Sequence, residues 1–242
     1  GIEVSLAAVA LGACVVVPPP LPSPYNRGVE YYDQGRLADA IEQYQLALRQ
    51  NPADTFSKYN LAVVYQDQEK YPEAIQLYQE ILAAIKDTNS QINLAAIYRA
   101  QGKEDLSIEE LQKATKSNQD NPNPASILGE YLERKNQLDS AEQHYASALK
   151  IDSKHAVSHY RMGRVLLKQN SQSKGTEHLQ KAVELEPQVP MYLEALGNEY
   201  ERQNKSLEAI NTLERLSVLQ PDRAEIYVRL GDLYKKENFF KE

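Results

Sequence analysis

One residue pattern returns along this chain at steps of 33 or 34 residues. In most copies a large apolar residue is followed directly by Ala or Gly, and Tyr or Leu comes three residues later. A fixed period of this length indicates one supersecondary unit that is stacked on itself, and such stacks expose extended surfaces for binding. The copies begin at Leu61, Leu94, Leu128, Met162, Leu196 and Leu230, with a less regular one at Arg27.

The second half of each unit carries a small residue and, four positions later, a large apolar one. Spacings of three and four residues place side chains on one face of an α-helix, so each unit is expected to contain two helices. Polar residues and turn formers separate the two halves, as in residues 34–36 and 203–205, and indicate short helix–helix turns. The small residues are Ala40, Ala74, Ser107, Ala141, Gly175 and Ala209, and the large ones are Tyr44, Tyr78, Leu111, Tyr145, Leu179 and Leu213.

In its small, aromatic and proline positions this unit resembles the tetratricopeptide repeat (TPR), and the resemblance covers residues 24–242. It implies an all-α fold, a right-handed α-solenoid of antiparallel helix pairs, with six full repeats and the first helix of a seventh. Because the seventh unit stops before its second helix, we expect the chain to be a fragment of a longer protein. The predicted repeats lie near residues 21–54, 55–87, 88–121, 122–155, 156–189, 190–223 and 224–242, so that the array spans 25–242.

The N-terminal residues differ in composition from the repeats. Residues 4–17 are apolar apart from one serine, and residues 18–24 form a proline-rich linker. The apolar run 4–17 is shorter than the roughly 20 residues needed to span a bilayer, but it matches the hydrophobic core of a signal peptide or part of a membrane anchor. Residues 11–14 resemble the lipobox of bacterial lipoproteins, which implies lipidation of Cys14. Three alternatives stay open: lipoprotein-like export, an uncleaved anchor, and a soluble apolar tail that packs on a partner.

The balance of charges argues against nucleic acid as the partner. The chain has 27 basic and 34 acidic residues, a net charge of −7, so phosphate backbones would repel it. Cys14 is the only cysteine, which excludes an intramolecular disulfide. A protein partner is therefore expected, with membrane contact through residues 1–17.

The sequence contains no convincing catalytic, cofactor or metal motif. His155 and His159 have the i,i+4 spacing of metal ligands on one helix, but His155 precedes the expected helix and no carboxylate completes a zinc-protease motif. No glycine-rich loop suited to phosphate is present. We therefore predict no enzyme activity, no catalytic residues, no cofactor and no metal site.

The resemblance places a partner-binding groove along the first helix of each repeat. Two interpretations stay open: these residues hold an extended or helical peptide, or they pack internally, with Arg161 and Arg164 paired to Glu130, Glu133 and Glu194. In the first interpretation the asparagine amides bind the peptide backbone, the aromatic rings anchor it, and the basic residues receive acidic groups. The candidate residues are Tyr25, Asn26, Phe56, Tyr59, Asn60, Asn93, Arg161, Arg164 and Lys168.

A specialised use of such grooves is excluded by the residues present. The family's clamp for chaperone carboxylate tails needs Lys and Asn at two positions where the first copy has Tyr25 and Val29. The sequence instead predicts a non-enzymatic TPR scaffold, membrane-associated on the periplasmic side of a bacterial envelope, that assembles or stabilises a multiprotein complex. The alternatives are a soluble, cytoplasmic TPR adaptor, or a regulatory segment of a longer protein with a catalytic domain beyond residue 242.

Overall fold

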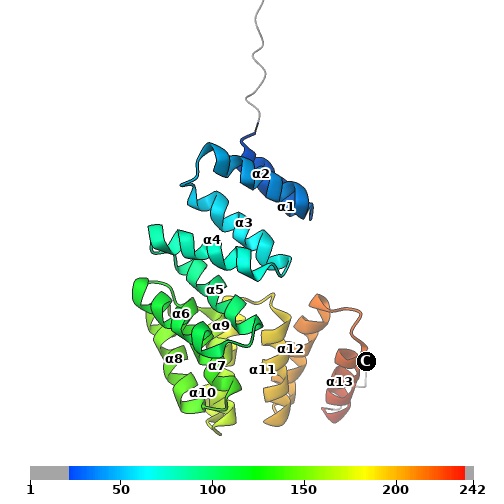
Figure 1. The fold of residues 1–242 in the computed structure, drawn as a ribbon. Coiled ribbons are helices and arrows are strands. Elements are labelled where there is room, and N and C mark those ends of the chain that lie inside the picture. The colour runs from blue at the N-terminus through cyan, green and yellow to red at the C-terminus, as the bar shows by residue number, and fades with distance from the viewer. Residues whose placement is uncertain (1–21, 238–242) are drawn as a thin grey trace, which may run out of the picture. The chain divides into compact units, whose positions relative to one another are not determined.

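A computed structural model describes residues 22–237 of the protein, and within that span it contains thirteen α-helices and no strand (Figure 1). The prediction of an all-α fold is thus confirmed. Residues 1–21 and 238–242 lie outside the described part, and so do Cys14 and the apolar segment 1–17. The helices are α1 (Pro24–Asp33), α2 (Leu37–Gln50), α3 (Thr55–Asp67), α4 (Tyr71–Ala84), α5 (Thr88–Ala100), α6 (Glu104–Ser117), α7 (Asn123–Arg134), α8 (Leu138–Ile151), α9 (Ala156–Lys168), α10 (Gln172–Leu185), α11 (Pro190–Arg202), α12 (Ser206–Leu219) and α13 (Ala224–Lys236).

The helices divide into two compact units, one ending at Lys70 and one beginning at Tyr71. In unit 1, α1 packs against α2 and α2 packs against α3. Gly28 of α1 allows this close approach, because a Cβ atom at that position would lie 2.5 Å from the ring of Tyr44 on α2. The Tyr44 ring fills the space above the glycine and is itself buried. The small and large residues found in the sequence therefore meet across the helix pair.

Unit 2 repeats the same packing along its length. The pairs α5/α6, α7/α8, α9/α10 and α11/α12 form in order, and each pair also packs on the helix that follows it. Gly129 of α7 lies against Tyr145 of α8 in the way that Gly28 lies against Tyr44. Gly163 of α9 faces the carbonyl oxygen of Gly175 on α10, so in this pair the two backbones themselves approach. Small residues at matched positions thus let consecutive helices pack closely around shared clusters of buried apolar side chains.

The turn inside each helix pair has one repeating conformation. One residue in each turn has a positive φ, in the left-handed region that ends many helices. The next N–H then donates to a carbonyl five residues back, as from Lys70 to Tyr65 and from Gln137 to Leu132, which satisfies a free carbonyl at the helix end. The turn residues with positive φ are Gly35, Glu69, Gly102, Asn136, Asn170 and Asn204. Among residues 22–237, no helix is both long and apolar enough to cross a membrane.

Candidate partner-binding surface

The candidate residues lie on the odd-numbered helices, and in each unit we call the surface formed by these helices the odd-helix face of that unit. In unit 1 this face carries Tyr25 and Asn26 on α1, and Phe56, Tyr59 and Asn60 on α3. Asn26 is exposed, and Phe56 is 72% exposed although its side chain is large and apolar. Tyr59 is half-buried. All five residues thus lie on the two odd-numbered helices of unit 1, and none of them is fully buried.

Two of the asparagines donate to tyrosine hydroxyls on other helices of the same unit. The Asn60 side-chain amide donates to the Tyr25 hydroxyl at 3.3 Å, and the Asn93 amide on α5 donates to the Tyr78 hydroxyl at 3.0 Å. The Tyr25 ring also packs against Tyr44, with centroids 6.2 Å apart. These amides thus help to position neighbouring helices within their own unit, and binding of a peptide backbone by them stays a prediction.

Arg161 of α9 forms part of a charge ladder across three odd-numbered helices of unit 2. One nitrogen of its guanidinium lies 2.9 Å from the Glu130 carboxylate on α7. Glu130 also lies 3.8 Å from Arg99 on α5. The Arg161 side chain is only 23% exposed, and its charge is largely neutralised by Glu130 within the protein. This pairing is the internal one that the sequence left open.

Arg164 and Lys168, also on α9, converge on one carboxylate. Glu133 of α7 is buried, and its Oε1 accepts from Lys168 Nζ at 2.8 Å and lies 3.3 Å from Arg164. The hydroxyl of Tyr145 donates to its other oxygen at 3.2 Å. Burial alone would raise the pKa of the Glu133 carboxyl, but Lys168, Arg164 and Tyr145 together hold it below its usual value. Glu133 is therefore an anion, shared by two cations that are 40% and 45% exposed.

A pocket of about 400 Å³ opens between α9 and α11 beside these two cations. Apolar side chains line it, among them Leu167 and Met191, and Met191 is 50% exposed. Arg202 stands at its border and holds the buried Glu199 through two hydrogen bonds, at 2.7 and 2.8 Å. Sequence reasoning missed Met191. The available signal was its position, second in its repeat, which it shares with the exposed Phe56 of unit 1.

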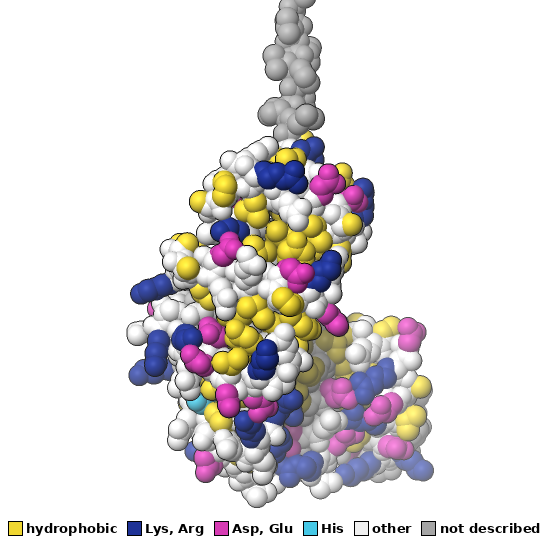
Figure 2. Space-filling model, viewed as in Figure 1, with side chains coloured by type: hydrophobic (Ala, Val, Ile, Leu, Met, Phe, Trp, Pro, Cys, Tyr) yellow, Lys and Arg dark blue, Asp and Glu magenta, His cyan; other side chains and the backbone are white. Residues whose placement is uncertain are grey.

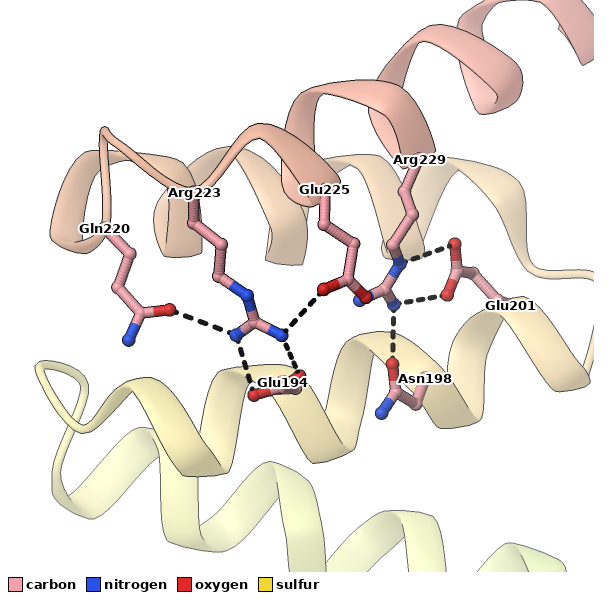
Figure 3. Close-up of polar contacts among 7 residues, drawn as sticks. All are labelled: Glu194, Asn198, Glu201, Gln220, Arg223, Glu225 and Arg229. Atoms are coloured by element: carbon pink, nitrogen blue, oxygen red, sulfur yellow. Dashed lines mark hydrogen bonds and ion pairs between the residues drawn. The ribbon is translucent and has the colours of Figure 1, made fainter.

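Side-chain pairs also connect α11 to the start and middle of α13. Arg223 donates to both oxygens of Glu194, at 2.6 and 3.0 Å, and this pairing lowers the pKa of the Glu194 carboxyl. Arg229 binds Glu201 and also donates to Asn198 at 2.6 Å (Figure 3). Glu194 therefore pairs with Arg223, and not with Arg161 or Arg164.

The character of the surface changes within unit 2. Hydrophobic side chains gather beside α5, whereas acidic and basic side chains are mixed over α11–α13 (Figure 2). A smaller pocket of about 170 Å³ lies where α5 and α7 meet, with Ile92 and Ile127 in its lining. In this view the surface of unit 2 thus has a hydrophobic region beside α5 and a charged region over α11–α13.

Three of the four histidines make hydrogen bonds within the protein. The His155 ring lies 2.7 Å from the Ser158 hydroxyl and 3.0 Å from the Asn123 side chain. His159 does not face His155; its Nδ1 lies 3.0 Å from Nδ1 of His178 on α10. Within residues 22–237 no group of three or more His, Cys, Asp and Glu side chains is placed to hold a metal ion.

Comparison with known proteins identifies the family. A family model described as tetratricopeptide repeat matches residues 25–89 and 92–156, which together make up more than half of the chain. The chain therefore belongs to the tetratricopeptide repeat family, whose members bind protein partners and are generally non-catalytic scaffolds. No curated protein matches the chain by sequence.

Several solved structures share the fold at low sequence identity. PilF of Pseudomonas aeruginosa superposes with a TM-score of 0.67 and 16% identity, over 88% of this chain and 96% of that one. A chain of the APC/C hetero-tetramer Cut9–Hcn1 gives a TM-score of 0.65 and 17% identity over 87% of this chain, which spans only 42% of the other. YrrB, described as a TPR protein with an unusual peptide-binding site, gives 0.51 and 23%, over 71% of this chain and 89% of that one. At these identities the likeness establishes the fold, a solenoid of paired helices.

Proposed function

We propose that this protein is a non-enzymatic TPR scaffold that docks a segment of a protein partner on its odd-helix face. The observation that carries the proposal is the pocket between α9 and α11, where Met191 is half exposed among apolar side chains. Many of the charged side chains around this pocket form ion pairs with one another. A large apolar side chain in a pocket with a charged border is typical of a protein-binding surface. The peptide-binding site named for YrrB and the complex named for Cut9–Hcn1 support the same use of the fold.

Site-specific photo-crosslinking tests where the partner binds. A photoreactive phenylalanine analogue replaces Met191 in one variant and Phe56 in another, in cells of the native source. A matched control replaces Val218 on the even-numbered helix α12, which is apolar and 78% exposed. We expect a discrete crosslinked partner from position 191 or 56 and none from 218. Equal crosslinking from all three positions would show that apolar exposure alone, and not the odd-helix face, captures proteins.

We further propose that the scaffold is held at a membrane, or exported across it, through residues 1–17, and that it stabilises a multiprotein complex there. Support comes from the sequence alone, namely the apolar run and the lipobox-like residues that end at Cys14. Fractionation of cells that express the chain with and without residues 1–17, and with Cys14→Ser, tests this part. If the full chain and the shortened chain both stay in the soluble fraction, the adaptor alternative replaces it.

A further inference from the structure

The partner chemistry of the α9–α11 pocket follows from an imbalance of charge at its border. Two cations, Arg164 and Lys168, share the single carboxylate of Glu133. Arg202, by contrast, has the Glu199 carboxylate to itself among the ion pairs of the described residues. Arg164 and Lys168 together carry two positive charges, and the Glu133 carboxylate with which they pair neutralises only one of them.

Burial separates the two signs of charge. The side chains of Glu133 and Glu199 are 5% and 4% exposed, whereas Arg164, Lys168 and Arg202 are 40% to 50% exposed. Glu194 also lines the pocket and is 34% exposed, but both of its carboxylate oxygens accept from Arg223. A molecule that approaches the α9 side of the pocket thus meets Arg164 and Lys168 first, with Glu133 beneath them. The electrostatic potential at this opening should be positive, although the whole chain has a net charge of −7.

The floor beside these cations is apolar. Leu167, Met191 and Ala195 line the pocket together with the Tyr160 ring, and the Arg164 guanidinium lies 5.5 Å from the centre of that ring. A side chain with a carboxylate can reach Arg164 and Lys168 while an aliphatic neighbour rests on Met191. Charge-assisted hydrogen bonds and burial of apolar surface would then act on adjacent residues of one segment.

We propose that the α9–α11 pocket binds a protein segment in which a Glu or Asp stands next to a large aliphatic residue, with the carboxylate between Arg164 and Lys168. This inference rests on the proposed function and names the partner segment. It also changes the predicted set of basic residues: Arg161 serves the ladder through Glu130, whereas Arg164 and Lys168 receive the partner.

Three capped synthetic peptides test the inference on the whole ¹⁵N-labelled chain. The first carries Leu-Glu-Leu-Glu between Gly-Ser ends; the second has Gln for each Glu, and the third has Ser for each Leu. At millimolar concentration the first should shift the amide signals of α9 and α11. The other two should bind about tenfold more weakly, the effect of losing one charge-assisted or apolar contact.

Matched variants locate the contact. Lys168→Gln removes the surplus charge and leaves Glu133 paired with Arg164, so the fold should persist, as its own amide spectrum will show. This variant should bind the first peptide about tenfold more weakly. Lys181→Gln on α10, which removes an equally exposed lysine away from the pocket, should bind it unchanged.

Each contrary outcome has a distinct meaning. If the Gln peptide binds as well as the Glu peptide, the acidic partner class is wrong, while docking on the odd-helix face still stands on the crosslinking result. If no peptide shifts α9 or α11, or if Lys181→Gln weakens binding as much as Lys168→Gln, the pocket assignment is overturned.

Discussion

Adding one methyl group at Gly129 should destabilise the protein because α7 and α8 are in contact there. A Cβ atom at this position would lie 2.6, 2.8 and 2.9 Å from three atoms of the Tyr145 ring. Carbon atoms at rest are about 3.5–4.0 Å apart, so the ring would have to move by about 1 Å. Tyr145 is fully buried and its hydroxyl is bound to Glu133, which leaves it little freedom to do so.

The size of the effect follows from two opposing terms. Overpacking of this kind costs about 1–3 kcal/mol. Replacing a helical glycine by alanine returns about 0.5–1 kcal/mol, because alanine loses less backbone entropy on folding. Gly129→Ala should therefore lower the free energy of unfolding by about 1 kcal/mol, the difference between these ranges.

Other glycines of the chain provide a graded control. At Gly231 of α13 no described atom lies within 4 Å of the Cβ position, so Gly231→Ala should raise stability by about 0.5–1 kcal/mol. At Gly197 the nearest atom, from Leu213, is 3.3 Å away, and the change should be close to zero. At Gly163 the nearest atom is the backbone oxygen of Gly175, at 2.8 Å, and the loss should exceed that at Gly129 because a backbone cannot rotate aside.

Urea denaturation followed by far-UV circular dichroism measures these four values, with the slope of each transition checked because repeat arrays can unfold in parts. In a double-mutant cycle with Tyr145→Leu, the double variant should recover about 1 kcal/mol of the loss caused by Gly129→Ala, measured against Tyr145→Leu alone. Leu213 occupies the position equivalent to Tyr145, and a Cβ atom at the facing Gly197 would lie 3.3 Å from it. The packing argument is refuted if Gly129→Ala and Gly231→Ala change stability equally, or if the double variant recovers nothing.

Three further changes test other parts of the structure with the same urea midpoints. Glu69 has a φ of 57° in its turn, a conformation that costs an L residue about 1–2 kcal/mol, so Glu69→Gly should raise stability by about 1 kcal/mol; a decrease would contradict the turn geometry. Burial and the adjacent His159 lower the pKa of His178, so the folded state favours the neutral ring. The contribution of His178 to the free energy of unfolding is therefore complete at pH values above the unfolded pKa of about 6.5, and it is lost as the pH falls below that value. The midpoint should therefore drop between about pH 7.5 and 5, and His178→Gln should reduce that drop; an unchanged pH dependence in the variant would exclude His178 as its source. Glu133→Ala should cost about 1–3 kcal/mol, because the buried Tyr145 hydroxyl loses its acceptor, whereas Glu104→Ala should have no measurable effect because its partner Lys135 is exposed; equal losses would refute the distinction.

The sequence alone sufficed for the class of fold and for much of the helix packing. Ala141 and Tyr145 stand four residues apart, and both are fully buried where α8 meets its neighbours. Helix formation depends on the spacing of residues within a segment, and the 34-residue period repeats that spacing in every unit. The helix pairs could therefore be predicted from the sequence without a structure. The turn around Asn136 was predictable for the same reason.

The candidate surface was predictable only in outline. The sequence placed Arg161, Arg164 and Lys168 together on one helix, but it could not distinguish internal pairing from partner binding. Their carboxylate partners lie 31 or 35 residues away, on another repeat. Which oxygen each cation reaches depends on how two helices stack and on the rotamers of long side chains, and neither is encoded by spacing within one helix.

The sequence by itself therefore determined the repeated helix pairs, the turns between them and the small residues that let the helices approach. Only the tertiary structure decided that Arg161 is held by Glu130, that Arg164 and Lys168 share the buried Glu133, and that Met191 lies exposed beside them. The physical reason is range. Helix formation and close packing depend on residues a few positions apart in the sequence. Which charged side chains can still bind a partner depends instead on the ion pairs that form between repeats, over about 30 residues.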